Sequence, residues 1–487
     1  MKKLLCVVLT LALVIGAISS VGARANADEA DYYYSVVFKS NEIPGDFNEE
    51  IANYGAKAIY SVPEVGFVQI QGKVDFLSKI KDMKGIQAAN PSLQWTMPEG
   101  KRIDAREEMV GAAGNEINNS YTERYWWDRQ WDIKRITENG NSYEFGTGSH
   151  DVAVAIIDTG IDRDHPDLVN NILPGSKNFV PSGGFRGTEP GETGNPNAFD
   201  DKHGHGSHVA GSIAANGYMV GVAPNTGIRA YRVFGTSSAE SAWIINAMIA
   251  AADDGADILS MSLGGFDVIG QVFYIDPETG KRENLGNDVA DFIAYKRAVK
   301  YATKKGTLVV VAAGNDAINC TNKREVTDFL NSEYGGDGII FVGAGFNVPA
   351  IYPEVVTVSA TGPEDVLANY SNYGPGFIDI GAVGGDARLY DQYLEEGRFD
   401  EYLANKLYYN EFCLSASEDG NYYYSIGTSM STPKVSAVAA LIIDKYGKMS
   451  PAKIKDMLVK KAIDSVKGND KKFFGAGHLN AYKALQE

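Results

Sequence analysis

The fold is decided by the stretch Val152-Ala153-Val154-Ala155-Ile156-Ile157, which runs directly into Asp158-Thr159-Gly160. A nearly unbroken apolar run of this length is typical of a parallel strand that is buried on both faces. Comparable runs follow at 228–234, 258–263, 307–312 and 355–358, and segments with helical periodicity lie between them at 239–253 and 287–304. Strands that alternate with helices predict an α/β fold whose central sheet is mainly parallel.

The composition is that of a globular protein with an acidic charge balance. Hydrophobic residues make up 44% of the 487 residues, which is enough for a large core. The chain has 62 acidic and 45 basic residues and a net charge of −17. This charge argues against nucleic acid and against an anionic membrane surface as partners.

The N-terminus has the pattern of an export signal over residues 1–27. Lys2 and Lys3 precede an apolar run at 4–18, and Ala25-Asn26-Ala27 has the small-x-small form of a cleavage site. A membrane anchor is the alternative, but the run is short for a bilayer. We therefore expect a secreted, extracellular protein that keeps no membrane anchor in its mature form.

Removal of the signal would leave two cysteines, Cys320 and Cys413. An even pair in an exported protein predicts one disulfide, and two free buried thiols are the alternative.

Two further parts precede the α/β domain. Residues 28–97 have strand-like stretches at 32–39 and 66–71 and helix-like stretches at 47–54 and 74–83, which predicts a small α+β domain. Residues 98–124 are polar and weakly periodic and are interpreted as a linker. The last domain, 125–487, opens with an aromatic cluster from Tyr125 to Trp131.

Three distant strings carry a carboxylate, an imidazole and a hydroxyl. Asp158 ends the first buried strand, His205 opens the string His205-Gly206-Ser207-His208-Val209-Ala210-Gly211, and Ser429 lies in Gly427-Thr428-Ser429-Met430-Ser431-Thr432-Pro433. A serine hydroxyl needs a base within hydrogen-bond reach, and the base needs an acidic partner. A zinc site built on His203, His205 and His208 is the alternative.

These strings, in this order, resemble the subtilisin-like serine proteases (subtilases, peptidase S8 family), and the resemblance covers residues 131–487. It implies a three-layer α/β fold in which Asp158, His205 and Ser429 form a catalytic triad. It also implies that Asn315, which follows the strand at 307–312, donates a hydrogen bond to the oxyanion. The α+β domain at 28–97 is then similar to the ferredoxin-like inhibitory propeptide of many subtilases. The cut that releases this propeptide would lie in the processing region, between about Glu99 and Arg124.

The resemblance also implies where substrate binds. Ser262, Leu263, Gly264 and Gly265 resemble the edge segment that pairs with an extended substrate backbone, and Asn347 would lie near the floor of the specificity pocket. Asp316 would either favour a basic residue before the scissile bond or be one more solvated carboxylate. No cofactor is expected.

Two departures from the family pattern bear on calcium and on substrate. Asp167, in His165-Pro166-Asp167-Leu168, resembles a calcium ligand, but the partner loop at 216–220 is short, and calcium needs six to eight oxygens. The short loop and an insert at 384–424 resemble the lantibiotic leader peptidase branch. That branch implies a lantibiotic precursor as substrate. A broad-specificity extracellular protease is one alternative, and a catalytically silent, peptide-binding relative is another. The insert itself is either a substrate-selecting flap or a surface decoration.

Overall fold

The computed structural model describes residues 32–73, 76–80, 83–92, 94–97, 100–111, 117–236, 238–276, 279–286 and 289–486. The predicted export signal at 1–27 lies outside these residues. Within them, no helix is both long enough and apolar enough to cross a bilayer.

The N-terminal domain is an antiparallel sheet with two helices. Its strand order is β2-β3-β1-β4, which is the order of the ferredoxin-like fold. Two of its strands, β2 and β4, were not apparent from the sequence pattern. The elements are β1 (Tyr32–Phe38), α1 (Phe47–Ala52), β2 (Lys57–Val62), β3 (Phe67–Gly72), α2 (Phe76–Ile80) and β4 (Ile86–Pro91).

The second domain is built on a sheet of nine strands in the order β20-β21-β17-β16-β14-β11-β7-β9-β8. Its neighbouring strands are parallel except for β20 and β21, so the predicted mainly parallel α/β sheet is confirmed. The strands are β7 (Ala153–Asp158), β8 (Lys177–Asn178), β9 (Gly227–Arg232), β11 (Ile258–Met261), β14 (Leu308–Ala312), β16 (Val356–Thr361), β17 (Ile380–Val383), β20 (Ile463–Ser465) and β21 (Gly477–Leu479).

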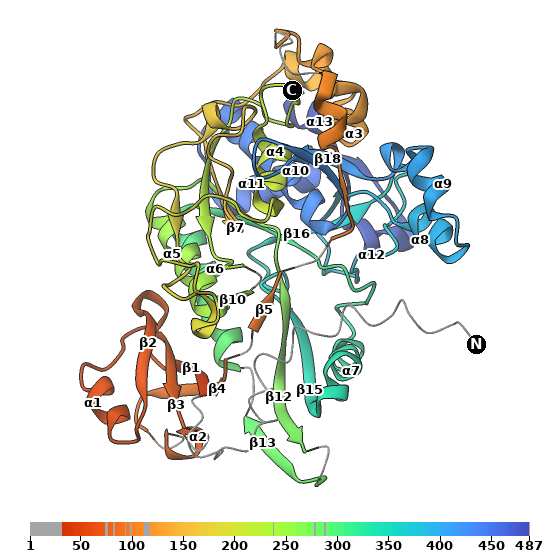
Figure 1. The fold of residues 1–487 in the computed structure, drawn as a ribbon. Helices are drawn as coiled ribbons and strands as arrows, with labels where there is room; N and C mark the ends of the chain where they lie inside the picture. The colour runs from red at the N-terminus through yellow and green to blue at the C-terminus, as the bar shows by residue number, and fades with distance from the viewer. Residues whose placement is uncertain are drawn as a thin grey trace.

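Helices cover both faces of this sheet and make three layers (Figure 1). Val154 and Ile156 of β7 pack on one face, and Ala155 and Ile157 pack on the other, which is why the run is apolar throughout. The first face carries α3 (Trp131–Thr137), α4 (His205–Ala214), α10 (Thr428–Tyr446), α11 (Pro451–Lys460) and α13 (Ala481–Leu485). The second carries α5 (Ser241–Asp253) and α6 (Val289–Lys305).

Two smaller sheets flank the central one. A long arm joins β12 (Gly265–Ile275), β13 (Arg282–Gly286) and β15 (Ile339–Val348), with α7 (Lys323–Tyr334) packed on it, and the sequence pattern did not predict it. The second sheet joins β18 (Cys413–Ala416), β19 (Tyr422–Ser425) and β6 (Arg102–Asp104). Because β6 belongs to the predicted linker, part of that linker is ordered structure docked on the second domain.

The insert forms two helices, α8 (Arg388–Glu395) and α9 (Phe399–Ala404). Glu411 holds the start of α8, because its carboxylate accepts hydrogen bonds from the N–H groups of Leu389 (2.7 Å) and Tyr390 (3.1 Å). It also accepts one from the Tyr402 hydroxyl of α9 at 2.8 Å. The insert is therefore fixed to the domain by buried polar contacts as well as by aromatic packing.

The predicted disulfide is wrong. Cys320 and Cys413 are both free and fully buried. Cys320 lies in the core between the sheet and helices α5 and α6, whereas Cys413 lies in the core that contains α4 and α10. The central sheet separates the two thiols, so the alternative of two buried thiols holds.

Candidate active site

The structure brings Asp158 and His205 into direct contact. Asp158 is the last residue of β7, and His205 is the first residue of α4. Nδ1 of His205 lies 2.7 Å from Oδ1 of Asp158, and both side chains are buried. Burial alone would lower the pKa of His205, but the charge of Asp158 and this hydrogen bond outweigh it, so the pKa lies above its usual value. The carboxylate therefore fixes the ring orientation and favours the imidazolium.

Asp201 positions the histidine helix, a role the sequence reasoning missed. Its buried carboxylate accepts hydrogen bonds from the N–H groups of His203 (2.9 Å), Gly204 (2.9 Å) and Ser207 (2.9 Å). It also accepts from the hydroxyls of Ser207 (2.7 Å) and Thr159 (2.9 Å). An acidic residue just before a helix start is a recognised capping signal and would have been the clue.

Ser429 lies in the first turn of α10 and faces Ser262. The Ser429 hydroxyl donates to the Ser262 carbonyl at 3.1 Å, and the Ser262 hydroxyl donates to the Ser429 carbonyl at 2.8 Å. The second bond is needed because Pro433, four residues on, has no N–H to satisfy the Ser429 carbonyl. No hydrogen bond joins Ser429 to His205 within the described residues, so a turn of the Ser429 side chain must precede any proton transfer between them.

Two N–H donors converge beside Ser429. A Cβ atom at Gly427 would lie 3.5 Å from Nδ2 of Asn315 and 3.6 Å from the backbone N of Ser429. The amide is aimed by its own oxygen, which accepts hydrogen bonds from Thr428 N and from Thr428 Oγ1, both at 2.9 Å. Gly427 has φ +150, so a glycine both permits this backbone and leaves the space before the donors open. Such a pair of donors can hold an oxyanion.

The other two histidines of the cluster point elsewhere. Nε2 of His208 lies 3.1 Å from the Cys413 carbonyl oxygen, and burial lowers the pKa of His208 well below its usual value. Burial also lowers the pKa of His203. No group of His, Cys, Asp or Glu that could hold a metal occurs in the described part of the chain. The geometry therefore gives no support to the zinc alternative.

The predicted substrate segment borders a cleft that the chain itself fills. Strand β5 (Gln94–Thr96) pairs antiparallel with β10 (Ser238–Glu240). Trp95 covers Gly265, since a Cβ atom there would lie 3.2 Å from the indole ring. The Trp95 Nε1–H donates to the Ser241 hydroxyl at 2.9 Å. The extended strand β5 therefore reaches the predicted substrate segment at Gly265 through the Trp95 side chain.

Asn347 lies beside Gly264, and Asp316 lies beside Gly314. Asn347 is buried in β15 and donates to the Ala313 carbonyl at 3.1 Å, and its Oδ1 would lie 3.8 Å from a Cβ atom at Gly264. The Asp316 carboxylate accepts a hydrogen bond from Asn372 at 2.8 Å. Burial raises the pKa of Asp316.

Comparison with known families gives one match, the subtilase family, over residues 149–477. The chain belongs to the subtilase family. It is 35% identical over 459 residues to the epidermin leader peptide-processing serine protease EpiP of Staphylococcus epidermidis, with 93% of each chain covered. It is 34% identical over 362 residues to the nisin leader peptide-processing serine protease NisP of Lactococcus lactis subsp. lactis, covering 74% of this chain and 50% of that relative.

Solved structures agree with this assignment. The crystal structure of EpiP from Staphylococcus aureus superposes with a TM-score of 0.78 at 32% identity and covers 94% of this chain and 98% of its own. The structure of NisP from Lactococcus lactis gives a TM-score of 0.65 at 35% identity, covering 74% and 95%. This subtilase is therefore a subtilisin-like serine protease.

The Asp167 site of this subtilase does not fit calcium. The Asp167 carboxylate accepts hydrogen bonds from Tyr218 N (2.6 Å), Met219 N (3.2 Å) and the Tyr422 hydroxyl (2.8 Å). These are N–H and O–H donors, whereas a calcium ion needs oxygen acceptors around it.

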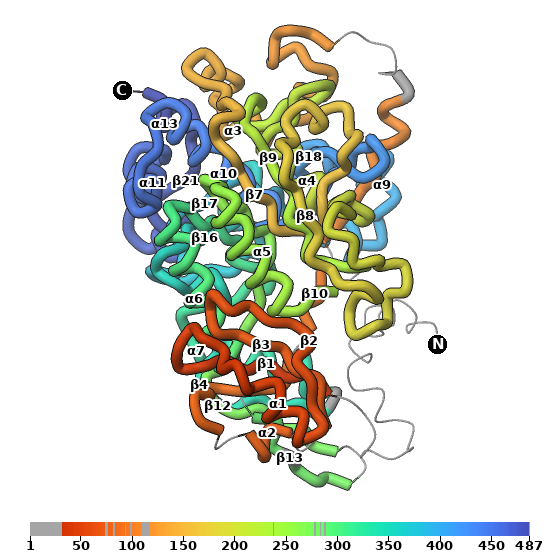
Figure 2. The backbone as a smooth tube through the Cα atoms, turned by 90° about the vertical axis from the view of Figure 1, so that its left-hand side faces the viewer, coloured from red at the N-terminus to blue at the C-terminus, as the bar shows by residue number. Residues whose placement is uncertain are grey.

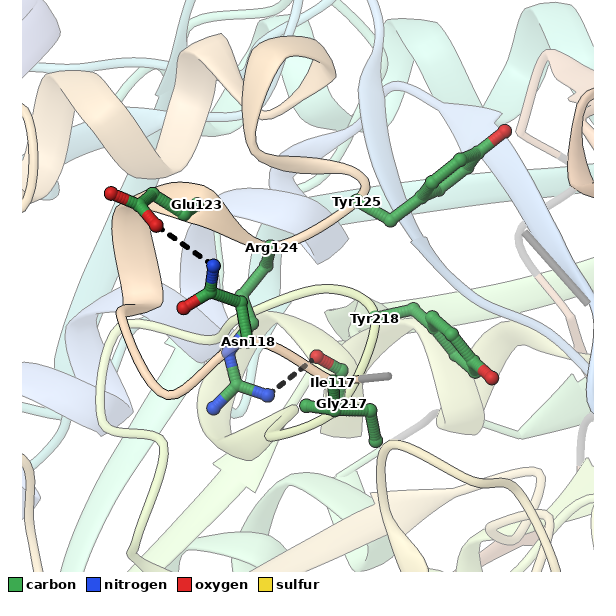
Figure 3. Close-up of a pocket in the computed structure, with 7 residues that line it drawn as sticks. All are labelled: Ile117, Asn118, Glu123, Arg124, Tyr125, Gly217 and Tyr218. Atoms are coloured by element: carbon green, nitrogen blue, oxygen red, sulfur yellow. Dashed lines mark hydrogen bonds between the residues drawn. The ribbon is translucent and has the colours of Figure 1, made fainter. Parts of the chain in front are cut away.

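The Arg124 guanidinium lies against the short loop at Gly217 (Figure 3). Arg124 is buried and donates from Nη1 to the Gly217 carbonyl (2.9 Å) and from Nη2 to the Asn216 side-chain oxygen (3.3 Å). The acceptor oxygens that a metal would use are therefore bound to a guanidinium.

We expect this subtilase to be insensitive to calcium removal. In the Ser429→Ala background, excess EGTA should leave the unfolding temperature unchanged.

Arg124→Ala should destabilise the fold by about 2 kcal/mol because it removes charged hydrogen bonds to buried acceptors. The measurement is thermal unfolding with EGTA or with added calcium.

Arg106→Ala is the matched control, since Arg106 is exposed and forms only a 3.6 Å ion pair with Asp104. A drop of several degrees on adding EGTA to the Ser429→Ala protein would contradict the assignment.

Proposed function

We propose that this protein is an exported serine endopeptidase that is made as a self-inhibited zymogen and processes a leader peptide. The observation that carries the hydrolytic role is the 2.7 Å contact of Asp158 with His205 at the start of α4, a helix that packs against α10, which carries Ser429 and its backbone donor. The export signal at 1–27 and the names of the two relatives support the remaining parts.

The chemistry assigns one role to each side chain. Ser429 rotates from the Ser262 carbonyl toward Nε2 of His205, which takes its proton as the hydroxyl attacks the peptide carbonyl. Asp158 stabilises the imidazolium. Asn315 and the Ser429 N–H hold the oxyanion of the tetrahedral intermediate. His205 then protonates the leaving amine, and a water deprotonated by the same ring cleaves the acyl-enzyme.

The zymogen proposal rests on the path of the chain through the cleft. Strand β5 pairs with β10, Trp95 packs against Gly265, and a Cβ atom at Gly100 would lie 3.1 Å from the Ser425 hydroxyl and 3.3 Å from the Ile426 carbonyl oxygen. Because Ser425 and Ile426 precede Ser429 by only three or four residues, we expect the maturation cut between Met97 and Gly100. A chain held this way excludes other substrates from the cleft.

The N-terminal domain is mounted on the catalytic domain through helix α6 (Figure 2). Arg297 donates to the carbonyls of Val65 (2.7 Å) and Phe38 (2.8 Å). Asp291 accepts hydrogen bonds from Ser35 (3.0 Å) and Asn90 (2.8 Å). These polar contacts support its role as the enzyme's own inhibitory propeptide.

A leader peptide is the proposed substrate, with a lantibiotic precursor as the class suggested by both relatives' names. Helix α8 of the insert contacts Lys101, just beyond the expected cut, and this contact favours a selective enzyme over a broad extracellular protease. The alternative is a catalytically silent protein, which would have the same fold and bind peptides but would not hydrolyse them.

One experiment separates these readings. The purified full-length chain is incubated, its junctions are mapped by mass spectrometry, and a fluorophosphonate probe is added. We expect a cut between Met97 and Gly100 and a label on Ser429. A chain that stays whole and takes no label would be a binding protein, and efficient cleavage of unrelated proteins would favour the broad protease.

A further inference from the structure

The chain that leaves the cleft becomes a strand on the catalytic domain. Strand β6 pairs antiparallel with β19, with Arg102 opposite Ser425 and Asp104 opposite Tyr423. Strand β19 ends at Ser425, four residues before Ser429. Residues that follow a cut between Met97 and Gly100 are therefore held by backbone pairing next to the nucleophile.

Lys101 lies in a site made by the insert. Its Nζ forms an ion pair with Asp391 and lies 4.3 Å from the centre of the Tyr390 ring, both on α8. An ammonium between a carboxylate and an aromatic face is bound by charge and by the ring quadrupole. In Figure 1 the chain beyond β5 runs upward beside α8 and α9.

Arg102 lies in a second site built from the β18–β19 hairpin. Its Nη2 donates to Glu418 (2.9 Å) and to the Ser417 hydroxyl (2.9 Å), and Nη1 donates to the His203 carbonyl (2.9 Å). The guanidinium carbon lies 4.0 Å from the centre of the Tyr423 ring. Carboxylate, carbonyl and ring together enclose a planar cation.

The catalytic domain holds both acids independently of Lys101 and Arg102. Asn369 donates to Asp391 at 2.9 Å, and Glu411 fixes the start of α8. Ser417 donates to Glu418. Burial raises the pKa of Glu418, but hydrogen bonds from the Ser417 hydroxyl and from the Glu418 backbone N–H oppose this effect without any help from Arg102. The two acids are therefore anionic sites that a substrate peptide can occupy once it displaces β6, which stays joined to the catalytic domain after the cut.

We propose that the cleft carries two subsites for basic side chains on the leaving-group side, Asp391 with Tyr390 and Glu418 with Tyr423. A substrate pairs with β19 as β6 does. Lysine or arginine side chains at positions two to five after the cut then occupy these two subsites. This inference rests on the proposed function and concerns the part of the substrate that is released as the new N-terminus. The insert thus acts in substrate selection.

The test uses enzyme matured from a chain that carries Lys101→Gln and Arg102→Gln, so that its own β6 does not compete for the two subsites, and an internally quenched peptide with the sequence of residues 92–106. Two further peptides carry Lys101→Gln or Arg102→Gln. We expect each replacement to lower kcat/KM about tenfold, the size of one charge-assisted contact. Asp391→Asn should cause the same loss with the parent peptide and little further loss with the Lys101→Gln peptide.

A charge exchange separates direct contact from a structural role. Asp391→Lys should reverse the preference and favour a Lys101→Glu peptide over the parent, which no general loss of folding would produce. Glu395→Gln, an exposed acid at the end of the same helix, is the matched control and should behave as the wild type.

The outcomes distinguish the inference from the proposed function. Equal rates for all peptides, or a cut after Lys101 or Arg102, would overturn the inference while leaving a working protease. An enzyme that cleaves no peptide and takes no fluorophosphonate label would overturn the proposed function instead.

Discussion

Ser429→Ala is expected to leave the full-length chain uncut and to abolish peptide hydrolysis. The Ser429 hydroxyl lies in the first turn of α10 beside the two converging donors, and alanine cannot form an acyl-enzyme. The expected loss in kcat is about 10⁶-fold, a magnitude measured in subtilisin itself. Intact mass after incubation and turnover of the 92–106 peptide are the measurements.

Ser431→Ala is the control for this variant. Ser431 is buried two residues further along the same helix, and its hydroxyl donates to the Ala382 carbonyl at 2.9 Å. Its loss should cost about 1 kcal/mol of stability and leave processing intact. Normal maturation of the Ser429→Ala chain, with no contaminating protease, would refute the assignment of the nucleophile.

Lys434→Met is expected to destabilise the catalytic domain by about 3–5 kcal/mol, because it leaves a buried carboxylate without its partner. Lys434 on α10 and Asp132 on α3 are both fully buried, and Nζ lies 2.8 Å from Oδ2. The Lys434 ammonium also donates to the Met430 carbonyl at 2.9 Å, one residue from Ser429. The measurement is thermal unfolding in the Ser429→Ala background.

Two comparisons interpret that result. The double variant Lys434→Met with Asp132→Leu removes both charges and should recover most of the loss, since apolar pairs often replace buried ion pairs without cost. Lys134, also on α3, pairs at 3.4 Å with Asp128, a largely exposed residue that precedes this helix, so Lys134→Met should change stability by less than about 1 kcal/mol. If Lys434→Met were as stable as the parent, the ion pair of Lys434 with Asp132 would not contribute to the stability of the domain.

The sheet could be predicted because its strands are buried on both faces. The runs at 152–157, 228–234, 258–263, 307–312 and 355–358 correspond to β7, β9, β11, β14 and β16. The arm strands β12 and β15 escaped because one face of the arm is solvated, as the exposure of Ile269 and Val342 shows. Their apolar residues do not form a continuous run.

The candidate residues of the site could be proposed from the sequence, but their contacts could not. Asp158, His205, Ser429 and Asn315 lie in short strings of distinctive composition, and this composition made them candidates. The reciprocal bonds of Ser429 with Ser262 and the loop filled by Arg124 depend on packing between segments far apart in the chain. The disulfide prediction failed for the same reason, because counting cysteines says nothing about which side of a sheet they occupy.

The passage of one unbroken chain through the cleft has a kinetic consequence. In the first cut, Ser429 attacks a peptide bond of its own chain, so the reaction should be first-order. Its rate should then be the same in dilute and concentrated samples. After the cut, the freed domain is held only by non-covalent contacts, and dilution favours its escape. Activity should therefore appear later than the cut, with a delay that shortens as the sample is diluted.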